Sequence, residues 1–224
     1  GKKVLAIDID PQGNTTSGFG VEKNELENTV YELILGECSV EECLIKNVVK
    51  NVSIIPSNVN LAAAEIELIG VDKKEYILKN EIDWIRDQYD FIIIDCPPSL
   101  GLITTNALNA SDSVLIPVQC EYYALEGLSQ LMSSVQAVKR RYNDRLELEG
   151  VLLTMYDGRL NLTQQVVTEI KKYFPRKVFA TVIPRTVRLS EAPSYGQPIL
   201  YYDKSNKGCI AYGALVDEIL KKNR

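Results

Sequence analysis

The stretch Val4-Leu-Ala-Ile-Asp-Ile-Asp10-Pro-Gln-Gly-Asn-Thr-Thr-Ser-Gly18 decides the fold, because an apolar strand here delivers two acids into a Gly/Asn/Thr loop. A loop of this composition can bind phosphate and metal. Phe91-Ile-Ile-Ile-Asp95-Cys-Pro-Pro-Ser-Leu-Gly101 repeats the plan, with a second apolar strand, an acid and a stiff Pro-Pro turn. Taken singly, each Asp is also typical of a turn former or a helix cap. Together, two acid-tipped parallel strands predict one shared site.

Apolar runs of strand length recur along the chain, and most are rich in Val and Ile. They are Val4–Ile9, Val52–Ile55, Phe91–Ile94, Val114–Val118, Gly150–Leu153 and Val178–Ile183. Their continuous apolarity indicates strands buried on both faces of a parallel sheet. Helical stripes lie between them, such as Leu78, Ile82, Ile85 and Tyr89. This alternation predicts an α/β fold with a doubly wound, mostly parallel sheet, whose ligands lie outside the carboxyl ends of the strands.

The length of 224 residues suits one α/β domain, and we expect residues 1–224 to form a single domain because no linker or repeat interrupts them. No apolar run approaches the roughly 20 residues that cross a bilayer. The start of the chain also lacks the features of a signal peptide, so a cytosolic protein is expected. The chain has no histidine, and its five cysteines include no Cys-x-x-Cys. Zinc binding and imidazole catalysis are therefore not expected, and the cysteines are interpreted as buried, reduced thiols.

The net charge of −5 is distributed unevenly along the chain. Residues 1–138 carry 9 Lys/Arg against 21 Asp/Glu, a net −12, whereas residues 139–224 carry 16 against 9, a net +7. A basic segment of this kind indicates either helices with solvated Lys/Arg faces or a surface that binds a polyanion. The residues alone leave both interpretations open.

The two acid-tipped strands and their flanks closely resemble the ParA-type partitioning ATPases. These are P-loop proteins of the deviant Walker class, related to MinD and the nitrogenase iron protein. The segment Ile183-Pro-Arg-Thr-Val-Arg-Leu-Ser-Glu-Ala-Pro-Ser-Tyr-Gly196 is the most ParA-like, because MinD and the iron protein differ there. The resemblance implies a MinD-like (SIMIBI) P-loop NTPase fold. The last helix, expected over Ala211–Lys222, has too few bulky apolar residues for a MinD-type membrane anchor, so no membrane partner is expected.

The resemblance also assigns roles to the acids. Asp8 and Asp10 match the first switch, where Asp10 would be the catalytic residue that positions the attacking water and Asp8 a cofactor-binding residue. Asp95 matches the Walker B acid, which holds Mg²⁺ through water. Pro97 and Pro98 match the second switch, a stiff turn that can follow the γ-phosphate.

Further roles follow from the resemblance in the basic part of the chain. Pro184, Arg185 and Thr186 match the loop that packs on adenine. Arg159 and Arg188 match positions that carry DNA-contacting arginines in the family. Each of these two arginines could instead be an ordinary surface residue or a partner for Asp157 or Glu191.

One part of the family pattern is missing from these residues. A P-loop ATPase needs a Gly-rich loop with a Lys and a Ser/Thr, and the family carries Lys-Gly-Gly-x-Gly-Lys-Thr-Thr upstream of a segment that looks like residues 1–10. Gly1-Lys2 is followed by Lys3-Val4, so it does not match, and we interpret Gly13, Gly18 and Gly20 as a flexible loop. The sequence is therefore expected to be truncated, with the first strand, P-loop and first helix absent.

The function that the resemblance implies is ATP-dependent DNA segregation. The intact protein would use ATP and Mg²⁺, form a homodimer, bind DNA non-specifically in the nucleoid region of the cytoplasm, and respond to a ParB-type DNA-bound activator. The 224 residues alone are expected neither to bind nor to hydrolyse ATP, which leaves enzymatic activity of this chain open. The alternatives are a non-catalytic DNA or partner-interaction fragment, and a MinD-like or orphan positioning ATPase.

Overall fold

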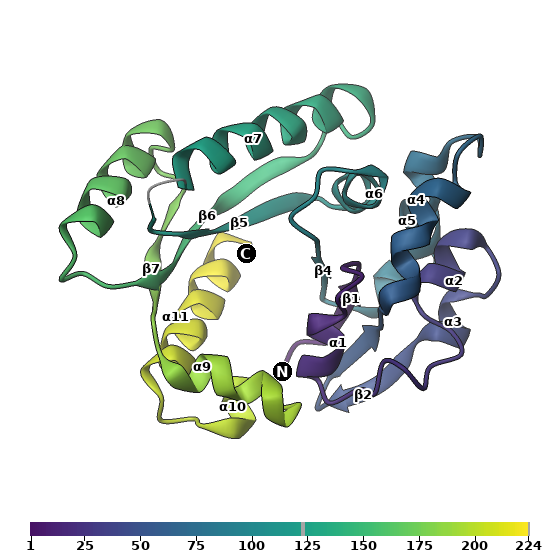
Figure 1. Cartoon of the computed structure of the whole chain (residues 1–224), viewed down its shortest axis with the longest axis horizontal. Coiled ribbons are helices and arrows are strands. Elements are labelled where there is room, and N and C mark those ends of the chain that lie inside the picture. Colours follow the sequence, from purple (N-terminus) through teal and green to yellow (C-terminus); the bar gives the residue numbers. More distant parts are fainter. Residues whose placement is uncertain (122–123, 224) are drawn as a thin grey trace. The chain divides into compact units, whose positions relative to one another are not determined.

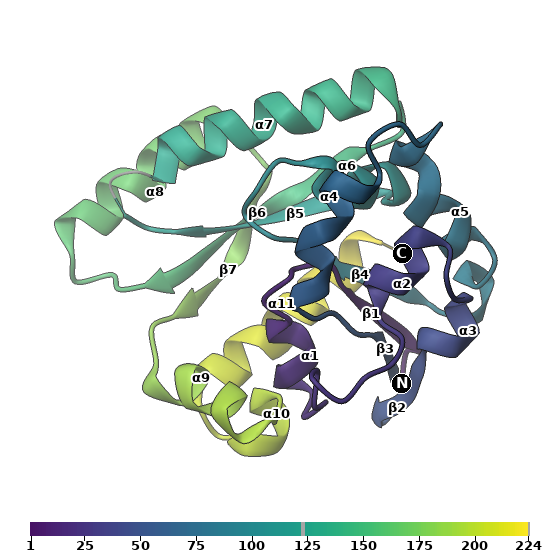
Figure 2. The same ribbon diagram turned by 45° about the vertical axis from the view of Figure 1, so that its right-hand side comes forward.

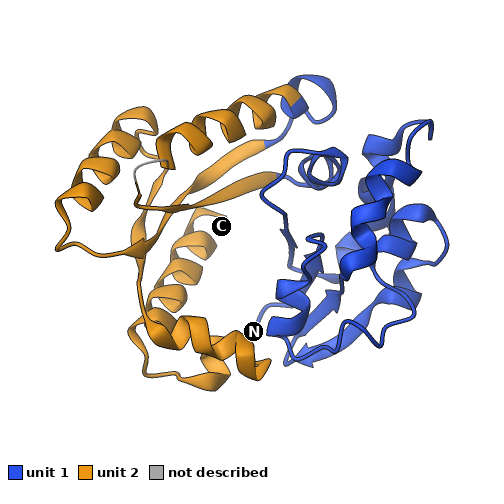
Figure 3. Ribbon diagram, viewed as in Figure 1, with its two compact units in different colours: residues 1–112, 138–146 blue, residues 113–137, 147–224 orange. Residues whose placement is uncertain are grey.

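The computed structural model describes residues 1–121 and 124–223 and divides the chain into two compact units (Figure 3). Unit 1 contains residues 1–112 and 138–146, and unit 2 contains residues 113–137 and 147–224. The expectation of a single domain over residues 1–224 stays a prediction. The division matters for the functional argument, because the acid-tipped strands belong to unit 1 and the basic late loop belongs to unit 2.

Unit 1 is built on a four-stranded sheet with the order β2-β3-β1-β4 (Figure 1). Strand β1 lies parallel to both of its neighbours, β3 and β4, whereas β2 pairs antiparallel with β3. The strands are β1 (Val4–Asp8), β2 (Ile45–Val49), β3 (Val52–Ile55) and β4 (Phe91–Asp95). The α-helices are α1 (Asn14–Gly18), α2 (Val30–Leu35), α3 (Val40–Cys43), α4 (Ala64–Glu67), α5 (Ile77–Asp83) and α6 (Leu102–Ala110), and the 3₁₀ turns are η1 (Val59–Ala63), η2 (Lys74–Tyr76) and η3 (Arg86–Gln88).

The core of unit 1 forms because alternate side chains of β1 and the apolar stripes of its helices meet. Leu5 and Ile7 on β1 are fully buried, and they pack with Leu33 of α2, Leu78 of α5 and Ile103 of α6. Helices α2 and α3 each begin with a capping box. In the box before α3, the backbone N–H of Ser39 donates to the Glu42 carboxylate at 2.7 Å.

Unit 2 is built on a parallel three-stranded sheet with the order β5-β6-β7. Figures 1 and 2 show α7 and α8 over one face of this sheet and α11 against the other. Alternate β6 residues account for this, since Val151 and Leu153 pack with α7 and α8 while Leu152 packs with Leu215 of α11. The elements are β5 (Ser113–Gln119), α7 (Ala124–Arg141), β6 (Glu147–Tyr156), α8 (Asn161–Tyr173), β7 (Val178–Pro184), α9 (Val187–Glu191), η4 (Ala192–Tyr195), α10 (Ile199–Tyr202) and α11 (Lys207–Lys222).

The predicted α/β class and the mostly parallel pairing are confirmed, and all six predicted strands are present. The strands form two sheets, because β4 and β5, which follow one another along the chain, are edge strands that do not pair. One feature differs from the expectation. Strand β2 was missed because Ile45-Lys-Asn-Val-Val lacks a continuous apolar run, and Asn47 has a positive φ of 56°.

The cysteines agree only in part with the expectation of buried, reduced thiols. All five cysteines are free thiols, but only Cys43, Cys120 and Cys209 are buried, so the prediction of burial is wrong for Cys96, which is exposed directly after β4. Among residues 1–121 and 124–223, no helix combines the length and apolarity that a membrane span requires.

Edge strand β4 generates a prediction about self-association. Its backbone is paired on one side only, and Ile93 on this strand is 60% exposed. Unpaired apolar edges recruit other strands. We expect the 224-residue chain to self-associate, and Ile93→Lys to raise the concentration needed for association by about tenfold or more. Light scattering over a concentration series measures this effect.

The control is Val59→Lys, which changes a comparably exposed apolar residue outside the strands. It should leave association unchanged. A chain that stays monomeric at every concentration and unfolds cooperatively would contradict the prediction.

Candidate functional site

The ends of β1 and β4 bring the two predicted acids side by side. Asp8 and Asp95 are direct partners in the parallel register of these strands. The backbone N–H of Ile9 donates to the Asp95 carbonyl at 2.9 Å, which continues the pairing beyond the end of the strand. The sequence-based prediction that the acid-tipped strands end together is therefore confirmed.

Asp8 is fully buried and braces the loop that follows β1. Its Oδ2 accepts hydrogen bonds from the backbone N–H of Thr16 at 2.8 Å and from Thr16 Oγ1 at 2.7 Å, and its Oδ1 accepts from the N–H of Asp10 at 3.1 Å. Burial raises the pKa of Asp8, and these hydrogen bonds oppose that shift. The structure thus gives Asp8 an internal bracing role. Its predicted contact with a cofactor stays a prediction.

Asp10 begins a tight turn rather than a flexible loop. Its Oδ1 accepts from the N–H of Gln12 at 2.9 Å, and its carbonyl accepts from the N–H of Gly13 at 2.9 Å. Gly13 has a φ of 60°, and an added Cβ would lie 2.8 Å from the Ser57 carbonyl oxygen, so only glycine fits. The flexible-loop interpretation is wrong for Gly13 and Gly18, because Gly13 is the N-cap of helix α1 and Gly18 is the last residue of this helix. The Asp10 side chain is only partly buried.

Asp95 is exposed and has a partner that the sequence analysis missed. Thr15 Oγ1 donates to Asp95 Oδ2 at 2.6 Å. Thr15 and Thr16 sit on the first turn of α1, so adjacent hydroxyls contact Asp95 and Asp8 respectively. The sequence did contain a signal for these partners, namely two adjacent threonines soon after an acid-tipped strand. A short helix at this position brings their hydroxyls back to the strand end.

The carboxylates at these two strand ends suit a hydrated Mg²⁺ better than a triphosphate. Mg²⁺ in proteins usually keeps several waters and one or two carboxylates, which Asp95 and Asp10 could supply. In the described residues no group of three His, Cys, Asp or Glu side chains forms a cage for a metal ion. The loop contains no Gly-rich phosphate cradle with its Lys. Lys23 donates to the carbonyl of Gln12 instead.

The segment after Asp95 is fixed at its far end. Thr104 Oγ1 donates to the Ser99 carbonyl at 2.6 Å, which ties the Pro97-Pro98-Ser99 turn to helix α6. The Glu65 carboxylate of α4 lies so close to Gly101 that a Cβ there would clash with it. These contacts connect the turn next to Asp95 with two helices of unit 1.

The late loop of unit 2 is ordered by helix caps and by the packing of Leu189 on the core around Leu152 and Leu215. Pro184 ends β7 opposite Tyr156, and Arg185 is exposed. Thr186 Oγ1 accepts from the N–H of Leu189 at 3.2 Å and so caps α9. The same oxygen lies 3.2 Å from Asn206 Oδ1, which caps α11. The adenine contact predicted for Pro184, Arg185 and Thr186 stays a prediction.

Both predicted DNA-binding arginines have acidic partners within unit 2. Arg159 donates to both carboxylate oxygens of Asp157, at 2.9 and 2.6 Å, and this pair lowers the pKa of Asp157. Arg188 donates to Glu191 Oε2 at 2.9 Å and lies 5.8 Å from the Tyr202 ring centroid. The sequence had left open that each arginine pairs with Asp157 or Glu191, and the structure shows both of these ion pairs. The Arg159 side chain remains 88% exposed and that of Arg188 53%, so both stay accessible.

Known protein sequences match this chain over most or all of its length. A profile of the AAA domain family matches residues 1–148. The sporulation initiation inhibitor protein Soj of Bacillus subtilis is 54% identical over 219 residues, which cover 98% of this chain and 87% of Soj. The chromosome partitioning protein ParA of Myxococcus xanthus is 47% identical over 222 residues, which cover 99% of this chain and 78% of ParA.

Solved structures share the fold. Cobyrinic acid a,c-diamide synthase from Mycobacterium smegmatis, with bound ATP analog and magnesium, is 33% identical with a TM-score of 0.86, covering all of this chain and 85% of the synthase. A putative plasmid partition protein from Borrelia burgdorferi bound to AMPPNP is 27% identical with a TM-score of 0.82, covering 99% and 87% of the respective chains.

The Asp8–Thr16 contact generates a pH-dependent prediction. Thr16→Val removes the hydroxyl bond to a buried carboxylate and the one accepted from the N–H of Ser57, so it should destabilise the fold by about 1–3 kcal/mol near neutral pH. Because burial raises the pKa of Asp8, ionisation of this carboxyl lowers the stability of the fold. This cost is absent below the ordinary pKa of 3.8 and complete above the pKa of the folded state. The variant should therefore lose less stability in acid than at neutral pH, as measured by denaturant unfolding.

Thr16→Ser keeps the hydroxyl and should recover most of the lost stability, and Thr15→Val, at a less buried site, should cost less. Equal destabilisation by Thr16→Val at both pH values would contradict the proposed role of the Asp8 charge.

Proposed function

Because the chain belongs to the ParA/Soj family of chromosome-partitioning ATPases, we propose that the intact protein is an ATP-dependent DNA segregation protein. It dimerises with ATP bound, binds DNA without sequence preference in the nucleoid, and leaves DNA when a ParB-type DNA-bound activator stimulates hydrolysis. The observation that carries the proposal is the paired strand end, where Asp95 lies next to Asp8 and the N–H of Asp10 donates to the Asp8 carboxylate.

Each acid has a distinct role in this proposal. Asp95, exposed and held by Thr15, binds Mg²⁺ through water. Asp10, anchored by the turn to Gln12 and Gly13, positions the attacking water. Asp8 keeps this turn in place through Thr16. Catalysis in phosphoryl transfer depends on such positioning and on charge stabilisation, since the protein forms no covalent bond to the phosphoryl group.

The nucleotide itself is supported by two kinds of observation. The synthase and the plasmid partition protein that share this fold carry an ATP analog with magnesium and AMPPNP respectively. In this chain the acids suit Mg²⁺, and Pro184, Arg185 and Thr186 offer the loop that would pack on adenine. The charge-neutralising phosphate loop is not among the 224 residues. On their own, these residues would act as a DNA or partner-binding fragment.

DNA binding is proposed for the basic third of the chain. Arg159 and Arg188 are exposed, and both stand in the segment with net charge +7. Their ion pairs with Asp157 and Glu191 are exposed to solvent, where salt bridges are weak, so a phosphate can replace the carboxylate as the partner.

The first test concerns nucleotide. Calorimetric titration of the 224-residue chain with Mg-ATP should give no binding at micromolar concentration and no turnover, because acids without a phosphate loop repel a triphosphate. In a form of the protein that also carries the family's Lys-Gly-Gly-x-Gly-Lys-Thr loop, Asp10→Ala and Asp95→Asn should each lower turnover about 100-fold or more. Turnover by the 224 residues alone, or full activity of both variants, would contradict the proposal.

The second test concerns DNA. Removal of either arginine, as in Arg159→Ala or Arg188→Ala, should weaken binding equally on unrelated DNA sequences and lower the slope of log affinity against log salt by roughly one unit. The charge reversals Arg159→Glu and Arg188→Glu should have a larger effect than removal. The measurement is a salt series in the intact, ATP-bound protein. Lys46→Glu, an exposed site in unit 1, is the matched control and should leave the slope unchanged. If both arginine variants bind like the parent, the DNA face lies elsewhere, with Lys171, Lys172, Arg176 and Lys177 the next candidates.

A further inference from the structure

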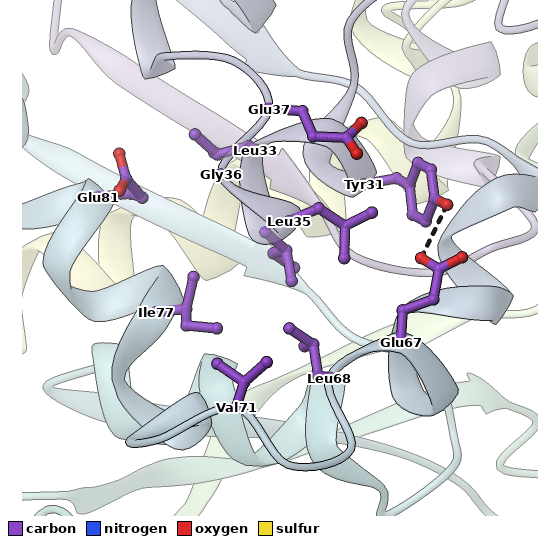
Figure 4. A pocket seen from close by; sticks show the side chains of 11 residues that line it. Tyr31, Leu33, Leu35, Gly36, Glu37, Glu67, Leu68, Val71, Ile77 and Glu81 are labelled. Carbon is purple, nitrogen blue, oxygen red and sulfur yellow. Dashed lines mark hydrogen bonds between the residues drawn. The ribbon is translucent and has the colours of Figure 1, made fainter.

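Unit 1 has an open groove of about 500 Å³ that plays no part in the acid site. Its apolar floor comes from the end of α2, from the turn after α4 and from the start of α5, as Figure 4 shows. Ile34 and Leu68 are buried beneath it, whereas Val71 is 43% exposed. The groove is lined by Tyr31, Leu33, Ile34, Leu35, Gly36, Glu37, Glu67, Leu68, Val71, Ile77 and Glu81.

The charged residues of the groove are all acidic. Glu37, Glu67 and Glu81 line it, and no Lys or Arg is among the lining residues. Figure 4 shows the three carboxylates spread around the apolar side chains, with Glu67 and Glu81 on opposite sides of them. Glu67 also accepts a hydrogen bond from the Tyr31 hydroxyl at 2.8 Å, which holds this carboxylate at the groove.

The titration behaviour of the lining residues agrees with a negative potential. The hydrogen bond to Glu67, together with burial and the charges of Glu37 and Glu32, raises the pKa of Tyr31. Burial and the charge of Glu41 raise the pKa of Glu81. Each ionised group here makes a further negative charge less favourable, so an anionic ligand would be repelled. A ligand with apolar groups and positive charges would complement both the apolar floor and the carboxylates of the groove.

We propose that this groove docks a short amphipathic segment of a partner protein, whose apolar side chains lie on the floor while Lys or Arg side chains pair with Glu37, Glu67 and Glu81. The groove is walled by helices, as in complexes where an amphipathic helix inserts apolar anchors spaced by three or four residues. Carboxylates on opposite sides of the floor match several separated cations of a peptide better than one small cation. This docking site is independent of the nucleotide and DNA interactions proposed above.

The charge of the groove predicts how binding responds to salt. Charge pairs at the rim of an interface are solvent-exposed and steer association, while buried apolar anchors supply most of the affinity. We therefore expect affinity to fall as salt rises, and loss of an apolar contact to weaken binding more than loss of one carboxylate.

The experiment uses peptides selected from a random 12-residue library displayed on phage, with the 224-residue chain as the target. The selected peptides should combine Leu, Ile or Phe at helical spacing with at least two Lys or Arg. Fluorescence anisotropy should then show binding weakened about tenfold or more by Val71→Asp and by the double change Glu37→Lys with Glu67→Lys.

The matched controls are Ile69→Asp and Glu25→Lys, which alter exposed residues of the same unit outside the groove. They should change affinity less than twofold, and thermal unfolding checks that every variant folds. The proposal is overturned if no peptide is enriched, if the enriched peptides are acidic or uncharged, or if groove variants bind as well as controls. It is also overturned if Val71→Asp dissolves a dimer seen by light scattering, because a second copy would then occupy the groove.

Discussion

The buried carboxylate of Asp8 is the interaction on which the rest of the acid site depends. A charge without solvent is costly unless hydrogen bonds compensate it, and here Thr16 supplies two and the Asp10 amide a third. These bonds fix the direction in which the chain leaves β1. They also hold helix α1 against the strand end, which places Thr15 within 2.6 Å of Asp95. A single buried acid therefore fixes the turn that carries Asp10 and the helix turn whose Thr15 contacts Asp95.

The parallel pairing of β1 with β4 adds the second constraint. Parallel strands present their carboxyl ends at the same edge, so residues far apart in the sequence meet there. The register makes Asp8 and Asp95 partners across 87 residues of chain. On the other side, β4 has no strand partner in the sheet of unit 1, and its exposed Ile93 shows that this edge is apolar. Asp95 thus stands at the end of a strand that is paired on one side only.

Charge separates the surfaces of the protein into different roles. The acid edge of β1 and β4 suits a hydrated cation, and the groove beside α2 and α5 suits a basic, apolar segment. The exposed arginines of unit 2 suit phosphate, although each is paired with a carboxylate in this structure. Such pairs restrain the guanidinium in a defined orientation and are exchanged readily in water, because exposed ion pairs contribute little to stability. The acidic residues 1–138 and the basic residues 139–224 thus differ in the charge that they can offer to a ligand.

The sequence by itself determined the six apolar strands, the α/β class and the meeting of the two acid-tipped strand ends. These features depend on short-range patterns, namely continuous apolar runs and an acid at each strand end. Only the tertiary structure decided that Asp8 is buried while Asp95 is exposed, that Thr15 and Thr16 are their partners, and that Glu37, Glu67 and Glu81 share a groove. It also decided that Arg159 and Arg188 are paired with acids, which the sequence had left as one alternative. The physical reason is that burial and hydrogen-bond partners depend on which segments pack together, and residues separated along the chain carry no local signal of that packing.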